Sequence, residues 1–116
     1  MANEIKNTSD SHLQATLSSL GVPVQRLRFT GEADTYFTWQ TIAGSEEAFA
    51  DDDNEEYEHF YRVDLFSRHN YVEKLVELRK ALKAAGFYGT QVTAEQYEQD
   101  TGLFHASLNT KFIEER

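Results

Sequence analysis

The chain has 116 residues, a net charge of −9 and a 40% content of hydrophobic residues, which together fit one globular domain. It contains no cysteine, so disulfides, zinc–thiolate sites and cysteine nucleophiles are excluded. No apolar run approaches the roughly 20 residues of a membrane span, and the polar N-terminus lacks the apolar core of a signal peptide. We therefore expect a cytoplasmic protein that does not associate with membranes.

The N-terminal half predicts one helix and two strands. After a polar tail over residues 1–9, Ser9 or Asp10 can cap a helix that runs to about residue 20 and has three leucines on one side. Gly21 ends this helix, and Pro23 makes the following chain extended. Strands are expected over 24–29 and 36–42. The alternation breaks within the first strand, which predicts a bulge or a change of face there.

The negative charge is concentrated in the segment that follows. Eight acidic residues and no basic residue lie between Glu46 and Glu58, so this segment accounts for eight of the nine net negative charges. Neighbouring carboxylates repel one another and also repel phosphate groups. We therefore expect an extended or mobile loop over 44–55 that does not bind nucleic acid.

The C-terminal half predicts a strand over 56–67, a helix over 70–86 and a final hairpin. Asn70 can cap the helix, and Val72 and Val76 widen its apolar stripe. Gly86 ends it. Strands over 92–98 and 103–113 are joined by the turn at Asp100-Thr101-Gly102.

These elements predict an α+β domain over residues 10–116. Its simplest arrangement is one mostly antiparallel sheet of about five strands, with both helices packed on one face. Alternation along the third strand divides its side chains between the two faces. The core face is expected to carry His59, Tyr61, Val63 and Leu65, and the other face Phe60, Arg62, Asp64 and Phe66.

The acidic segment resembles a metal site in part of its spacing. Asp51, Asp53 and Glu55 alternate as the ligands of a calcium loop do, but Glu56 stands where such a loop needs glycine. Strands rather than helices are also expected on either side. We therefore predict a solvated loop with no cofactor, and weak divalent-cation binding at a subunit interface remains an alternative.

No set of residues indicates catalysis, so the sequence predicts a protein that is not an enzyme. None of the four histidines has metal-ligand spacing to another, although His59 and His105 lie in expected strands and could pair across the sheet. Ser67 and Ser107 belong to no nucleophile motif. The mixed aromatic and charged face of 60–66 is instead typical of an assembly surface. That face could equally well pack under the acidic loop.

Several stretches resemble one protein family in their order and spacing. They are Val63-Asp64-Leu65-Phe66-Ser67, the helix from Asn70-Tyr71 to Ala85-Gly86-Phe87, Tyr97-Glu98 and Asp100-Thr101-Gly102-Leu103-Phe104-His105. Leu20-Gly21-Val22-Pro23-Val24 and Ala48-Phe49-Ala50-Asp51-Asp52 are also similar. In these features the chain resembles the tail completion, or tail terminator, proteins of long-tailed phages and prophages. The resemblance covers most of residues 20–108 and is lost at both ends.

The resemblance implies a structural role in virion assembly. Proteins of this family form a ring, commonly a hexamer, that caps the head-proximal end of the tail tube and joins the tail to the head. The implied partners are other copies of the chain, the tail tube protein and head–tail connector proteins, while DNA passes through the lumen without specific binding. The implied locations are the host cytoplasm during assembly and then the virion tail, and the free protein could be a monomer.

Two groups of residues are the candidate contacts in such a ring. The acidic segment, with Asp51, Asp52, Asp53, Glu55 and Glu56, suits either the lumen or a subunit boundary, and the lumen is favoured. The second group is Phe60, Arg62, Asp64 and Phe66. Two other functions remain as alternatives: a head-completion adaptor on the portal side, and a small cation-binding or hydrolytic domain.

Overall fold

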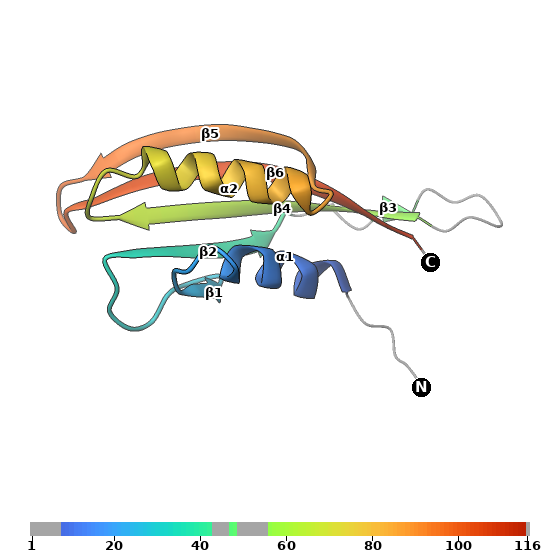
Figure 1. Cartoon of the computed structure of the whole chain (residues 1–116), viewed down its shortest axis with the longest axis horizontal. Coiled ribbons are helices and arrows are strands. Elements are labelled where there is room, and N and C mark those ends of the chain that lie inside the picture. The colour runs from blue at the N-terminus through green and yellow to red at the C-terminus, as the bar shows by residue number, and fades with distance from the viewer. Residues whose placement is uncertain (1–7, 43–46, 49–55, 116) are drawn as a thin grey trace.

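The computed structural model describes residues 8–42, 47–48 and 56–115 of the chain. In these parts two helices accompany one sheet (Figure 1). The elements are α1 (Thr8–Ser18), β1 (Val24–Arg26), β2 (Thr35–Thr41), β3 (Glu47–Ala48), β4 (Glu56–Ser67), α2 (Val72–Ala84), β5 (Tyr88–Glu98) and β6 (Leu103–Glu115).

The sheet has the strand order β1-β2-β4-β6-β5, and β3 also pairs with β4. Strands β1 and β2 run parallel, and every other pair is antiparallel. The centre is the long β4–β6 ladder, which runs from Glu56 opposite Glu115 to Ser67 opposite Phe104. This mostly antiparallel sheet with two helices confirms the expected α+β class.

Both helices cover the same face of the sheet and bury the core against it. Figure 1 shows α1 beside β1 and β2, and α2 beside β5 and β6. The core includes two leucines from each helix together with the inward residues of the central strands. Tyr61, Val63 and Leu65 are at most 1% exposed and His59 is 6% exposed, so the predicted core face of β4 is confirmed. The opposite face of the sheet, called here the open face, has no helix among the described residues.

The start of α1 differs from the expected cap. The helix begins at Thr8, so Ser9 lies inside it and is fully buried. The Ser9 hydroxyl lies 2.8 Å from the Tyr61 hydroxyl, which donates to Asp10 at 2.6 Å. The expectation that Ser9 or Asp10 caps the helix was wrong, because both lie inside it and their side chains bind the Tyr61 hydroxyl instead.

Strand β1 is shorter than expected. It ends at Arg26, where the expected strand continued to Phe29, because Leu27 adopts a left-handed backbone with φ 71°. Its side chain is 63% exposed. The break in alternation therefore marks the end of the strand rather than a bulge within it.

Gly86 follows α2 with φ 95° as expected, but the N-cap is Tyr71 rather than Asn70, and Tyr71 makes no side-chain capping hydrogen bond. The Asn70 side chain accepts a hydrogen bond from the Val72 amide at 2.9 Å. The apolar stripe of the helix is narrower than expected. Val72 and Val76 are 53% and 46% exposed, so the prediction that they widen the buried stripe was wrong. Strand β5 begins at Tyr88, earlier than expected, and contains two register shifts.

Candidate functional site

A polar network occupies the middle of the open face. The register places Asp64 on β4 directly opposite Ser107 on β6. His105 lies two residues before Ser107 on β6, so its side chain is on the same face of the sheet. Asp64 and Ser107 are 6% and 4% exposed. Two buried polar side chains therefore lie on the face of the sheet that no described helix covers.

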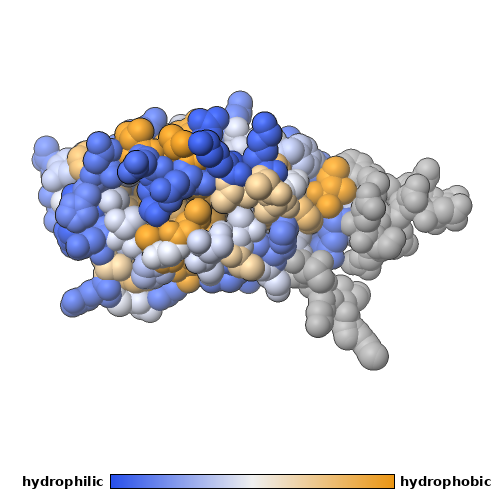
Figure 2. All heavy atoms as spheres, viewed as in Figure 1, coloured by the Kyte–Doolittle hydropathy of each residue, from blue (hydrophilic) through white to orange (hydrophobic). Residues whose placement is uncertain are grey.

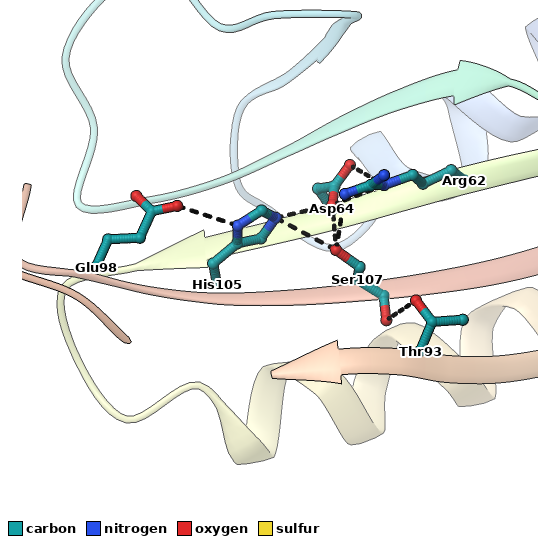
Figure 3. Close-up of polar contacts among 6 residues, drawn as sticks. All are labelled: Arg62, Asp64, Thr93, Glu98, His105 and Ser107. Atoms are coloured by element: carbon teal, nitrogen blue, oxygen red, sulfur yellow. Dashed lines mark hydrogen bonds and ion pairs between the residues drawn. The ribbon is translucent and has the colours of Figure 1, made fainter. Parts of the chain in front are cut away.

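Asp64 accepts hydrogen bonds from three side chains (Figure 3). The Ser107 hydroxyl donates at 2.5 Å and His105 Nε2 lies 2.8 Å away. Arg62 Nε lies 3.2 Å from both carboxylate oxygens, and its Nη2 donates to the Ser107 hydroxyl at 3.2 Å. A buried carboxylate is tolerated when its charge is paired in this way.

His105 connects this carboxylate to a second one. Its Nδ1 lies 3.2 Å from Glu98 Oε2, at the end of β5, while its Nε2 faces Asp64. A carboxylate only accepts hydrogen bonds, so the ring can satisfy both carboxylates when both of its nitrogens carry protons. The network thus joins three strands: β4, β6 and β5.

A row of stacked rings continues from His105 across the open face. Phe66 stacks on His105 with ring centroids 4.1 Å apart, Tyr36 stacks on Phe66 at 4.9 Å, and Phe29 stacks on Tyr36 at 4.1 Å. Burial in this row raises the pKa of Tyr36, and the negative charge of Glu98 adds to the effect while Arg68 opposes it. This row covers the polar network on one side.

Ser107, His105 and Asp64 are not arranged as a catalytic triad with an activated serine. An activated serine would donate its proton to the histidine, but the Ser107 hydroxyl donates to Asp64. His105 Nε2 is 3.4 Å from that hydroxyl and 2.8 Å from Asp64, so the carboxylate holds the histidine nitrogen. The geometry supports a structural network that fixes the register of β4 on β6.

A second cluster lies on the open face near the other end of β4. The Lys111 ammonium lies 5.4 Å from the centre of the Phe60 ring and 5.9 Å from that of the Tyr88 ring. The Tyr88 hydroxyl donates to Glu58. Burial and this hydrogen bond raise the pKa of Tyr88 to about 12.

A basic groove lies on the helix side of the molecule, between the end of α2 and the start of β5. It has a volume of about 460 Å³. Its walls carry Arg79, Lys80, Lys83, Phe87, Tyr88 and Thr90. The sequence pattern did not predict this groove, because it forms only where the helix packs beside β5.

Of the two predicted contact groups, the described residues contain only one in full. Phe60, Arg62, Asp64 and Phe66 share the open face as expected, but Asp64 is buried in the network. Residues 51–53 and Glu55 lie outside the described residues, and Glu56 begins β4 opposite Glu115.

The sequence analysis assigned no site to His105 and Ser107, and it did not single out Glu98. Residues 105 and 107 alternate along the last strand, which was the available signal, but nothing in the sequence indicated Asp64 as their partner. His59 and His105, which could have paired across the sheet, do not, since Phe112 lies opposite His59 and Phe66 opposite His105.

In the described part of the chain, no group of three or more histidine, aspartate or glutamate side chains is placed to hold a metal ion. The ring nitrogens of His105 point to two different carboxylates, so these groups do not converge on one point. Among the same residues, no helix is long and apolar enough to cross a membrane.

Comparison with known proteins gives a likeness in fold. No protein-family model matches the chain, and no curated protein matches it in sequence. Among solved structures, the chain is similar to one from the virion of a native gene transfer agent particle. The two share 15% sequence identity with a TM-score of 0.51, over 92% of this chain and 91% of the other.

Proposed function

We propose that this protein is a non-enzymatic structural component of a phage-like virion. The observation that carries the proposal is the fold shared with the gene transfer agent chain, because it spans nearly the full length of both proteins. Fold alone does not determine function. The proposal therefore also draws on the family resemblance of the sequence, which points independently to virion assembly.

The finer form of the proposal is a tail completion protein. It would form a ring, commonly hexameric in the family it resembles, that caps the head-proximal end of the tail tube and joins the tail to the head. Two of the resembling stretches meet in the fold: the strand end at Val63–Ser67 pairs with the hairpin strand at Phe104–Leu108. The resembling residues thus form one continuous part of the sheet, which supports treating them as one unit.

The open face supports a role in contacts rather than in catalysis. Its serine and histidine are held by Asp64, and its periphery carries partly exposed aromatic and basic side chains such as Phe60 and Arg62. A mixture of aromatic and arginine side chains is typical of protein–protein interfaces. We propose that this face contacts the tail tube or a connector protein.

The test is to add the purified protein to growing tail tubes and to image the products by electron microscopy. We expect tubes of limited length with additional density at one end, and we expect these tubes to join filled heads. Tubes that continue to grow unchanged would contradict the tail role. Binding to portal-bearing heads instead of tubes would identify the protein as a head-completion adaptor.

A further inference from the structure

The basic groove defined above presents three cationic side chains that nothing in the described structure neutralises. Arg79, Lys80 and Lys83 are exposed, and no ion pair or hydrogen bond holds their side chains among the described residues. By contrast, Lys74 on the same helix pairs with Glu77 at 2.9 Å. These three cations therefore form a local positive patch in a chain with a net charge of −9.

The rest of the groove is apolar. Phe87 closes its base and is only 3% exposed, Tyr88 is 38% exposed, and Gly89 brings the backbone of β5 close to the opening. Figure 2 shows small hydrophobic areas among hydrophilic side chains on the side of the molecule that carries α2. A matching ligand would combine an aromatic or aliphatic side chain with several carboxylates.

The chain itself contains such a ligand. Residues 48–53 read Ala-Phe-Ala-Asp-Asp-Asp, one aromatic side chain followed at once by three carboxylates. We propose that the basic groove binds residues 48–53 of a second copy of this chain, with Phe49 against its apolar lining and the aspartates beside Arg79, Lys80 and Lys83.

The sheet order disfavours the same contact within one chain. Ala48 pairs with Tyr57 on the β2 side of β4, whereas the groove lies at β5, on the far side of β6. Three strand spacings separate β3 from β5, about 14 Å. Phe49 follows Ala48 directly, and consecutive Cα atoms are only about 3.8 Å apart. The distance from Ala48 to β5 therefore favours the groove of a second copy over that of the same chain.

The contact would be head-to-tail, because the segment and the groove are different parts of one surface. Contacts of this kind close into rings or extend into filaments. Under the proposed function, on which this contact rests, the groove and the segment would form the subunit contact of the ring. The acidic segment would then lie at a subunit boundary rather than in the lumen. A DNA ligand is disfavoured, since the overall negative charge repels phosphates.

The first test uses a synthetic peptide of residues 47–56, titrated into the full-length protein and followed by amide NMR shifts. We expect shifts at Lys80, Lys83 and Thr90. Lys80→Glu should weaken binding about tenfold or more. Arg28→Glu, which makes the same charge change at an exposed site far along the chain, should alter it less than about twofold.

Several results would overturn the inference. They are the absence of peptide binding at millimolar concentration, unchanged binding by a peptide with asparagine at 51–53, and displacement of the peptide by a short DNA duplex at lower concentration. A peptide with alanine at position 49 should also bind more weakly, because the aromatic contact would be lost.

The second test exchanges charges between two variants and measures association by sedimentation. One variant carries Lys80→Glu and Lys83→Glu, and the other Asp51→Lys and Asp53→Lys. Each alone should associate less than the unmodified protein, and an equimolar mixture should recover association, because each groove then meets a segment of opposite charge. Equal behaviour of the mixture and the separate variants would overturn the contact, while the tail-tube experiment would still decide the virion role independently. Circular dichroism checks that both variants fold.

Discussion

Asp64 shows how one residue acquires its environment from distant parts of the chain. Strand alternation predicts its face of the sheet, but its burial and charge pairing depend on Ser107 and His105, more than forty positions later. A single sequence contains no pattern that joins these positions. The side of the sheet was therefore predictable for Asp64, and its network was not.

We predict that Asp64→Asn lowers the free energy of unfolding by about 2–4 kcal/mol. The amide keeps the size of the side chain but removes the charge that accepts from Arg62, His105 and Ser107. Urea denaturation measures the change. The matched control is Asp34→Asn, at a carboxylate that is 68% exposed, which should change stability by less than about 0.5 kcal/mol. Equal losses in both variants would contradict a buried network.

Tyr61 leads to a prediction for alkaline pH. Burial, and then the hydrogen bond to Asp10, raise the pKa of Tyr61 far above its ordinary value of 10.0. Above pH 10 the unfolded chain loses this proton while the folded protein keeps it, so stability falls as pH rises. Below pH 10 this residue contributes no pH dependence.

Tyr61→Phe should therefore lower stability by about 1–2 kcal/mol at neutral pH, through the lost hydrogen bonds to Ser9 and Asp10. Above pH 10, the deficit should shrink by about 1.4 kcal/mol per pH unit. Urea denaturation between pH 7 and pH 11.5 measures both proteins. Parallel stability curves above pH 10 would show that Tyr61 keeps an ordinary pKa.

At the scale of elements, α2 was predicted best because its start, end and main apolar stripe are all local features. Gly86 ends the helix as expected, whereas the N-cap is Tyr71, and Asn70 just before it accepts a hydrogen bond from the Val72 amide. The width of the buried stripe was overestimated, since which residues meet the sheet depends on how the helix lies on β5 and β6. The exposure of the Val72 and Val76 side chains follows only from that orientation.

We predict that Leu82→Ala costs about 2–5 kcal/mol of stability, because this fully buried side chain fills the core between α2 and the sheet. Val76→Ala, on the exposed side of the same helix, should change it by less than about 0.5 kcal/mol. Urea denaturation followed by helical circular dichroism separates the two. A large loss for Val76→Ala would mean that the helix turns this side chain into the core.

At the scale of the whole molecule, both described helices lie on one face of the sheet, and no described helix covers the other face, which we expect to make contacts. Aromatic side chains on the two faces should therefore differ in what they do for assembly. Phe60 lies on the open face beside Lys111, whereas Tyr97 lies on the helix-side face of β5 against Phe104 and is 53% exposed.

We predict that Phe60→Gln lowers stability by only about 1 kcal/mol, since it removes a partly exposed cation–π contact. It should nevertheless reduce head joining in the tail-tube experiment at least about tenfold, as expected for an aromatic interface residue. Tyr97→Gln is the matched control and should join heads normally. Equal activity of the two variants would remove the open face from the proposed interface.

The sequence by itself determined the α+β class, the main helix with its ends, the two faces of β4 and the concentration of charge near residues 46–58. These follow from periodicity, turn chemistry and composition, all of which act between residues close together in the chain. Only the tertiary structure decided the burial of Asp64, the exposure of Val76 and the groove between α2 and β5. Each depends on which distant elements become neighbours, and strand order and helix orientation are set by the packing of the whole core rather than by any local pattern.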